Sequence, residues 1–200
     1  MSFFLMAGCA TSVEPAAIRA AHAVPAKQRE AVAVWLINSP LDPLGVTGLS
    51  DLARAIRKAG FDVVLLPRAS GGGLAERVRE AHANGRTCAL IAWSGASLWV
   101  HDALSKLERD GGWVELVVYL DSNWIKDRIE KSGHPDNAQR MVLIYRQNNA
   151  FPRIEGAKRY AVDEWNHLAV PRREETATAL VRELARLAGR SVVAKPEPTP

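Results

Sequence analysis

Three side chains of the types that acyl-transfer enzymes use lie far apart in this chain: Ser94, Asp121 and His167. A serine becomes a nucleophile when a histidine takes its proton, and a carboxylate orients that histidine and stabilises its charge. Ser94 lies in residues 92–96 (AWSGA), between an apolar run and a helical pattern. The small residues on either side suit a sharp strand-to-helix turn, because the two backbones approach closely there. The pattern predicts a nucleophile at Ser94, although a helix-capping serine fits the same residues.

Asp121 and His167 follow predicted strands. Asp121 comes directly after the apolar run 114–120, and His167 comes five residues after the run 158–162. If both runs belong to one parallel sheet, these residues emerge at the carboxyl edge, where ligand crevices of open α/β sheets lie. Asp163, four residues before His167, is a rival acid. An aspartate at a strand end also fits a helix cap, so both roles stay open for Asp121.

The segments around these residues alternate between β-favouring and helical patterns. Strands are expected at 31–37, 61–66, 87–92, 114–120, 140–145 and 158–162, and helices at 49–59, 74–83, 97–108, 124–131 and 174–187. Such alternation predicts an α/β fold, a predominantly parallel sheet flanked by helices on both faces in a three-layer sandwich.

Length and composition indicate one domain. The chain has 200 residues, of which 48% are apolar, enough for a single core. We expect the domain to span 30–190, after a possible lipoprotein signal, tether and short helix in 1–29. The Pro-rich segment 191–200 is expected to be disordered. The 26 Lys and Arg residues are scattered among 22 Asp and Glu residues, which gives no reason to expect a nucleic-acid partner.

With Ser94, Asp121 and His167 in that order on alternating strands and helices, residues 31 to 188 resemble the α/β-hydrolase fold family of serine esterases, lipases and thioesterases. The resemblance implies a Ser-His-Asp triad, an acyl-enzyme intermediate, a small ester or acyl substrate and no cofactor. In most members the acid follows the next strand, and the position of Asp121 is a known variant. Only about twenty residues separate the runs ending at 120 and beginning near 140, so a minimal, lidless member is expected.

The oxyanion-binding loop and the substrate pocket are less clearly indicated. The resemblance implies that the Gly95 N–H binds the oxyanion, with a second donor at Ser39 or Leu41, because Pro40 has no N–H. The family's usual His-Gly pair is absent from this loop. Three tryptophans next to the predicted triad residues, Trp93, Trp124 and Trp165, fit either an apolar pocket or the core. An impaired oxyanion site would favour the alternative of a non-catalytic envelope protein that binds a lipid, glycan or protein partner.

The N-terminal residues 1–10 (MSFFLMAGCA) resemble the end of a bacterial lipoprotein signal. They predict lipidation of Cys9, membrane attachment and a place in the cell envelope. Met6 stands where leucine is usual and no charged n-region precedes it, so an untethered tail on a cytoplasmic protein is the alternative.

Signatures of metal and nucleotide sites are missing from the sequence. There is no H-E-x-x-H or C-x-x-C, so no metal is expected. The triplet 71–73 (GGG) lacks the Lys-Ser/Thr end of a phosphate loop, which weighs against a third alternative, a flavodoxin-like nucleotide-binding module.

Overall fold

The computed structural model describes residues 11–40, 47–66 and 73–190. Six strands form one sheet in which all neighbouring pairs are parallel, in the order β2-β1-β3-β4-β5-β6. The strands are β1 (Val32–Ile37), β2 (Asp62–Leu66), β3 (Thr87–Trp93), β4 (Leu116–Leu120), β5 (Met141–Arg146) and β6 (Lys158–Val162).

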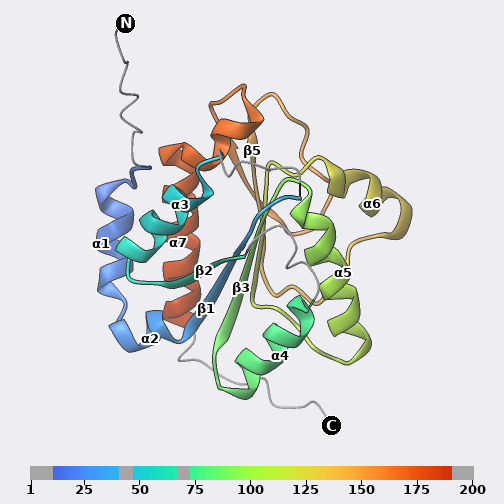
Figure 1. Ribbon diagram of the computed structural model, residues 1–200, viewed down its shortest axis with the longest axis horizontal. Coiled ribbons are helices and arrows are strands. Elements are labelled where there is room, and N and C mark those ends of the chain that lie inside the picture. The colour runs from blue at the N-terminus through green and yellow to red at the C-terminus, as the bar shows by residue number, and fades with distance from the viewer. Residues whose placement is uncertain (1–10, 41–46, 67–72, 191–200) are drawn as a thin grey trace, which may run out of the picture.

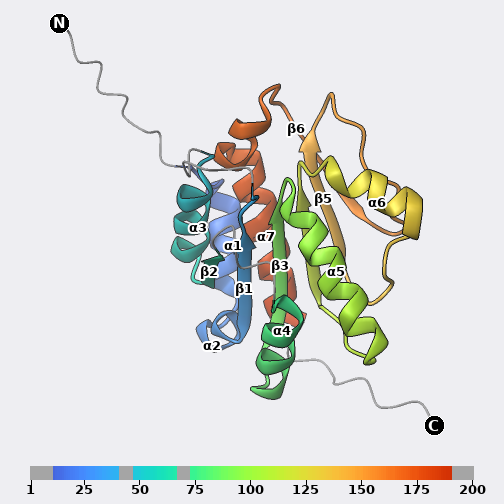
Figure 2. The same cartoon turned by 45° about the vertical axis from the view of Figure 1, so that its right-hand side comes forward.

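Helices cover both faces of this sheet (Figure 1). They are α1 (Pro15–Ala23), α2 (Ala26–Glu30), α3 (Leu49–Lys58), α4 (Leu74–Ala83), α5 (Ala96–Arg109), α6 (Trp124–Ser132) and α7 (Glu174–Arg190), with a 3₁₀ helix η1 (His167–Arg172). The turned view shows α1, α3 and α7 on one side of the sheet and α4, α5 and α6 on the other (Figure 2). The three-layer α/β fold expected from the sequence is confirmed.

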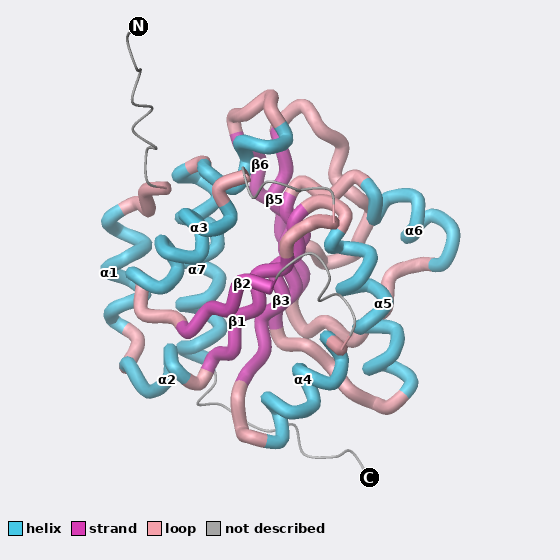
Figure 3. The backbone as a smooth tube through the Cα atoms, in the orientation of Figure 1, coloured by secondary structure: helices cyan, strands magenta, loops and turns pink. Residues whose placement is uncertain are grey.

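The two layers of helices enclose two cores. Along β1, Val34 and Leu36 belong to the core beneath α3 and α7, whereas Trp35 and Ile37 belong to the core beneath α4 and α5. Every residue of β1 is buried. Burial on both faces explains why the inner strands β1, β3, β4 and β5 are apolar runs rather than alternating ones, whereas the edge strands β2 and β6 are partly exposed. The tube in Figure 3 shows the strands passing between the two groups of helices.

Several boundaries follow the sequence closely. The predicted elements 74–83 and 158–162 have the bounds of α4 and β6. The expected strand 87–92 extends to Trp93 and the expected helix 97–108 begins at Ala96, so that only Ser94 and Gly95 connect β3 to α5. The strand expected from 114 begins at Leu116, because Val114 forms only an isolated bridge with Ala138.

The sequence indicated a tether with a short helix ahead of a domain that begins at residue 30, and the structure shows how such a helix packs. Helix α1 packs against α7, and its residues Ala17 and Ala21 are buried in the core that α3 and α7 cover. Their small side chains allow this close packing, so residues 15–23 form part of the folded domain. Cys9 and the tail 191–200 lie outside the described residues. Across the described ranges, no helix combines the length and the apolar character needed to cross a membrane.

Candidate active site

Ser94 forms the turn between the central strand β3 and helix α5. Its backbone is left-handed, with φ of 53°, and its side chain is largely covered, the residue being 5% exposed. A left-handed residue other than glycine costs about 1–2 kcal/mol, so this turn stores strain. Ala92 and Ala96 on either side are buried, as expected for a turn in which strand and helix approach closely. This is the backbone geometry that a nucleophile elbow requires.

Buried hydrogen bonds hold the backbone of this turn. The Ser94 N–H donates to the carbonyl of Leu120 at 3.0 Å, which continues the pairing of β3 with β4. The Ser94 carbonyl accepts from Ser97 Oγ at 2.9 Å and from Ser122 Oγ. The hydroxyl of Tyr145 in turn donates to the Ser122 carbonyl at 2.8 Å. The turn is therefore attached to α5, β4 and β5, through residues that sequence reasoning did not assign to the site.

His167, the first residue of η1, lies between the other two predicted residues. Its Nε2 is 2.9 Å from Ser94 Oγ, and its Nδ1 is 2.7 Å from Asp121 Oδ2. Because an ionised carboxylate only accepts hydrogen bonds, Nδ1 carries the proton and the lone pair of Nε2 faces the serine hydroxyl. Both distances fall within about 2.6 to 3.2 Å, the hydrogen-bonding range in which a general base can take a proton.

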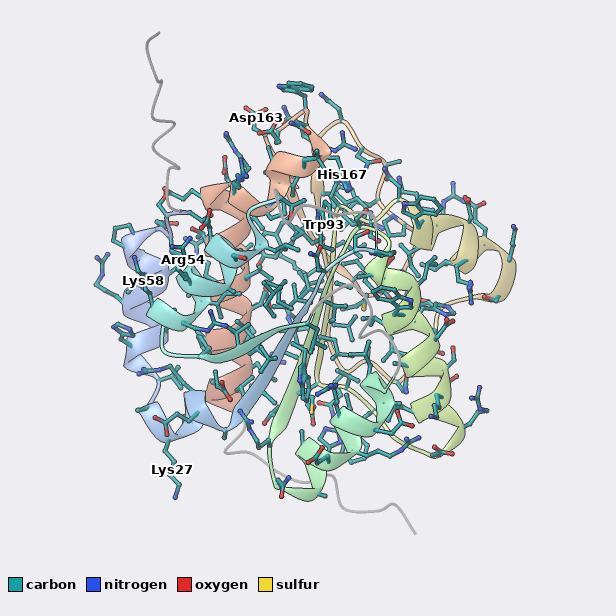
Figure 4. All side chains as sticks on the ribbon, in the orientation of Figure 1. Lys27, Arg54, Lys58, Trp93, Asp163 and His167 are labelled. Atoms are coloured by element: carbon teal, nitrogen blue, oxygen red, sulfur yellow. The ribbon has the colours of Figure 1, made fainter. Side chains whose placement is uncertain are left out.

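Trp93 lies against the imidazole of His167. The two rings stack with centroids 5.0 Å apart and planes inclined by 18°, and Figure 4 shows both near the end of the sheet. At 1% exposure Trp93 belongs to the core, which differs from the pocket wall suggested as one of its two roles. Trp124 and Trp165 lie at the surface, 54% and 81% exposed, and their part in a substrate pocket stays a prediction.

Asp121 is fully buried at the end of β4 and also has a left-handed backbone, with φ of 43°. Besides His167, its carboxylate accepts from Arg146 Nε at 2.7 Å, from the Arg146 N–H at 3.4 Å and from Asn149 Nδ2 at 2.9 Å. Burial alone would raise its pKa, but the hydrogen bonds from His167 and Asn149 and the charge of Arg146 outweigh burial and lower the pKa. The carboxylate is therefore ionised at neutral pH.

Asp163, the alternative acid, is hydrogen-bonded to Gln147. Asp163 accepts a hydrogen bond from Gln147 Nε2 at 2.5 Å, and Figure 4 shows it beyond His167 at the outer end of the loop. Arg146 and Asn149 were missed by sequence reasoning. They lie at and just after the end of β5, which is where most members of the resembled family carry their acid. Polar residues at a neighbouring strand end are the signal that could have identified them.

The predicted oxyanion residues lie next to each other. A Cβ placed on Gly95 would be 3.3 Å from Ser39 Oγ and 3.6 Å from Pro40 Cδ, so the loop after β1 contacts the turn after β3. Among the described residues, no hydrogen bond is recorded for the Gly95 N–H. Leu41, the other candidate donor, lies outside the described residues.

A second polar cluster lies near the opposite edge of the sheet. The side-chain donor atoms of His82, Cys88 and Glu115 lie within 4.8 Å of one another, a combination that could hold a metal ion. The Glu115 carboxylate already interacts with His82 Nε2 at 3.1 Å and accepts from the Cys88 N–H and Trp113 Nε1, both at 2.9 Å. Burial raises the pKa of the Cys88 thiol to about 12, so without a metal ion the thiol stays protonated and is a poor nucleophile.

Comparison with known proteins identifies the fold. No protein-family model matches the chain, and no curated protein matches it by sequence. Among solved structures it is similar to the mature form of the lipase BlEst2 from Bacillus licheniformis, with a TM-score of 0.52 and 13% sequence identity. The match covers 78% of this chain and 92% of the lipase chain. At this identity the similarity is one of fold, and it supports the α/β-hydrolase fold that the residue order predicted.

Proposed function

We propose that this protein is a serine hydrolase that cleaves a carboxylic ester or thioester through an acyl-enzyme intermediate. The observation that carries the proposal is the unbroken series of hydrogen bonds from Ser94 Oγ through His167 to Asp121. The three residues come from three separate elements of the fold, and they meet at the carboxyl edge of a parallel sheet. The lipase fold of the similar structure agrees with ester hydrolysis.

The proposed reaction has two halves. Ser94 Oγ attacks the carbonyl carbon while His167 Nε2 takes its proton, and Asp121 stabilises the imidazolium that forms. When the tetrahedral intermediate collapses, the bond to the leaving alkoxide or thiolate breaks, and His167 gives the proton to that group. A water molecule then attacks the acyl-Ser94 ester, losing a proton to His167, and the carboxylic acid leaves as Ser94 regains its proton.

The oxyanion of each tetrahedral intermediate is assigned to Gly95 and Ser39. The Gly95 N–H lies at the start of α5, where helix geometry favours negative charge. Ser39 is the second donor in the proposal because its loop contacts Gly95 directly. Losing one such donor typically lowers kcat by about 10²- to 10³-fold, so the competence of this loop determines whether the enzyme is fast or slow.

A fluorophosphonate probe tests the assignment of the nucleophile. We expect the probe to label the wild-type protein at Ser94, and Ser94→Ala to abolish labelling without unfolding the protein. Ser105→Ala is a matched control, because Ser105 lies within α5 and its hydroxyl donates to the His101 carbonyl of the same helix rather than to a histidine side chain. A folded wild-type protein that is not labelled would overturn the proposal.

The non-catalytic alternative is less well supported. It was motivated by Pro40 in the oxyanion loop, and it would be favoured by a histidine too far from the serine to take its proton. The observed 2.9 Å between His167 Nε2 and Ser94 Oγ weighs against it. Binding of a lipid or glycan without any turnover is the outcome that would revive it.

We also propose that the protein is attached to the cell envelope through lipidated Cys9. The support is the N-terminal sequence pattern alone. Metabolic labelling with a radioactive fatty acid should mark the wild-type chain and not Cys9→Ala. Labelling of neither chain would show that the protein is not lipidated, and equal labelling of both would show that the lipid is attached to a residue other than Cys9.

A further inference from the structure

Arg146 connects the buried carboxylate to the loop that carries His167. It is the last residue of β5, and its Nε donates to Asp121 Oδ2 at 2.7 Å. Its Nη1 donates to the carbonyl of Trp165 at 2.7 Å, two residues before His167. Its own backbone N–H points at the other carboxylate oxygen, at 3.4 Å. One side chain thus contacts the acid and the segment that presents the base.

We propose that Arg146 is a positioning residue of the hydrolase, which fixes His167 relative to Asp121 and sets the lower limit of the pH range in which the enzyme works. This inference rests on the proposed function. A guanidinium suits the task because its planar group donates in several directions at once, whereas the ammonium of lysine acts as a point charge on a flexible stem.

Among the described residues, Arg146 is the lysine or arginine whose side chain contacts the Asp121 carboxylate directly. The other groups that face Asp121 are His167, Asn149, Lys126 and Tyr145. Lys126 Nζ donates to the amide oxygens of Asn149 at 2.9 Å and of Asn123 at 3.3 Å rather than to the carboxylate. Burial raises the pKa of Tyr145 well above its usual value, which keeps that hydroxyl neutral. Arg146 therefore adds a permanent positive charge to the hydrogen bonds that compensate for burying this carboxylate.

The sign of the effect on pH dependence follows from this arrangement. His167 must be neutral to accept the proton of Ser94, so activity falls as the imidazole becomes protonated. A fixed positive charge beside the Asp121–His167 pair opposes that protonation, and it also shares the carboxylate that would stabilise the imidazolium. The acidic limb of the pH profile is the range in which kcat/KM falls as the pH is lowered. Removing the charge of Arg146 should move this limb to higher pH by about one pH unit, the lower end of the shift that a neighbouring charge causes.

Two substitutions separate the charge of Arg146 from its shape. Arg146→Gln removes both, and we expect the shifted acidic limb together with a fall in kcat of about 10- to 100-fold, the scale of a small misplacement of a catalytic group. Arg146→Lys keeps the charge but not the two-way contact. We therefore expect a lower kcat with the wild-type acidic limb. Because the lysine variant retains a partner for the buried carboxylate, it also tests the inference if the glutamine variant does not fold.

Arg140→Gln is the matched control. Arg140 lies just before the opposite end of the same strand, and it clamps another fully buried carboxylate, Glu183, through Nε at 2.5 Å and Nη2 at 3.0 Å. Its loss should lower stability and leave the acidic limb unchanged.

The outcomes distinguish the two proposals. A wild-type protein that neither reacts with fluorophosphonate nor hydrolyses esters removes the proposed function. If the wild-type enzyme is active, the role of Arg146 is refuted, and the proposed function is kept, when Arg146→Gln has the wild-type kcat and the wild-type acidic limb of kcat/KM. The role of Arg146 is also refuted when Arg140→Gln shifts the acidic limb by the same amount as Arg146→Gln. The same holds if Arg146→Lys matches the wild type in both kcat and acidic limb.

Discussion

The strain at the Ser94 turn predicts an inverted response to glycine. At most positions glycine is less stabilising than alanine, because it loses more conformational freedom on folding. The left-handed backbone of Ser94 reverses this order, since only glycine adopts such a conformation without cost. Ser94→Gly should therefore be more stable than Ser94→Ala, and neither variant should turn over substrate. Comparing the two variants isolates the backbone, because both lack the hydroxyl that contacts His167.

The expected difference follows from two opposing effects. Relief of the left-handed conformation is worth about 1–2 kcal/mol. The greater flexibility of unfolded glycine costs about 0.5–1 kcal/mol. At the midpoints of these two ranges, the free energy of unfolding of Ser94→Gly should exceed that of Ser94→Ala by about 0.75 kcal/mol, which corresponds to about 1.5–3 °C in Tm for a domain of this size.

Urea unfolding followed by circular dichroism measures this difference, with Ser105 as the internal reference. Ser105 lies within α5, where glycine should be less stable than alanine by about 1 kcal/mol. The two sites should therefore differ by roughly 1–2 kcal/mol in their preference for glycine, because the flexibility cost of glycine is common to both and only position 94 gains relief from the left-handed conformation. If glycine destabilises position 94 as much as it destabilises position 105, the account of a strained elbow is wrong.

Two further predictions concern buried carboxylates. Every recorded partner of the Asp121 carboxylate is a donor, so the amide group of Asp121→Asn must face a donor in either orientation. We expect kcat to fall by about 10⁴-fold, or about 5.5 kcal/mol, and a fall of less than about tenfold in steady-state assays would contradict a triad. For Glu183, burial opposes ionisation, but hydrogen bonds, first that of Arg140, lower the pKa from 4.5 to about 2. Its contribution to stability is therefore present above about pH 4.5 and lost as the pH falls toward 2, and Glu183→Gln should weaken this acid sensitivity in thermal melts. An unchanged dependence of Tm on pH in that variant would refute the assignment.

Much of the fold could be predicted because its signals are local. The helix 74–83 has apolar residues at helical spacing, and the buried strands are apolar runs between glycines and polar loops. The residue order along alternating elements also placed Ser94, Asp121 and His167 at one edge of the sheet. The parallel pairing of β3 with β4 then brings Ser94 and Asp121 to neighbouring strand ends.

The supporting residues could not be predicted, because their roles depend on contacts across the sheet. Trp93 faces the core covered by α7 since strand residues alternate between faces, but only the path of η1 brings His167 over it. Arg146 and Ser122 look like ordinary polar residues in the sequence. Their importance appears once β5 and β4 are neighbours and the loop before His167 folds back toward them.

The most direct test of the account is the location of the acyl group during turnover. The wild-type protein would be mixed with an activated ester, quenched in acid and digested, and the peptides analysed by mass spectrometry. The account predicts that the acyl group is attached to Ser94, and that Ser94→Ala neither carries it nor hydrolyses the ester. Acylation of a different residue, or ester hydrolysis by Ser94→Ala at the wild-type rate, would contradict it.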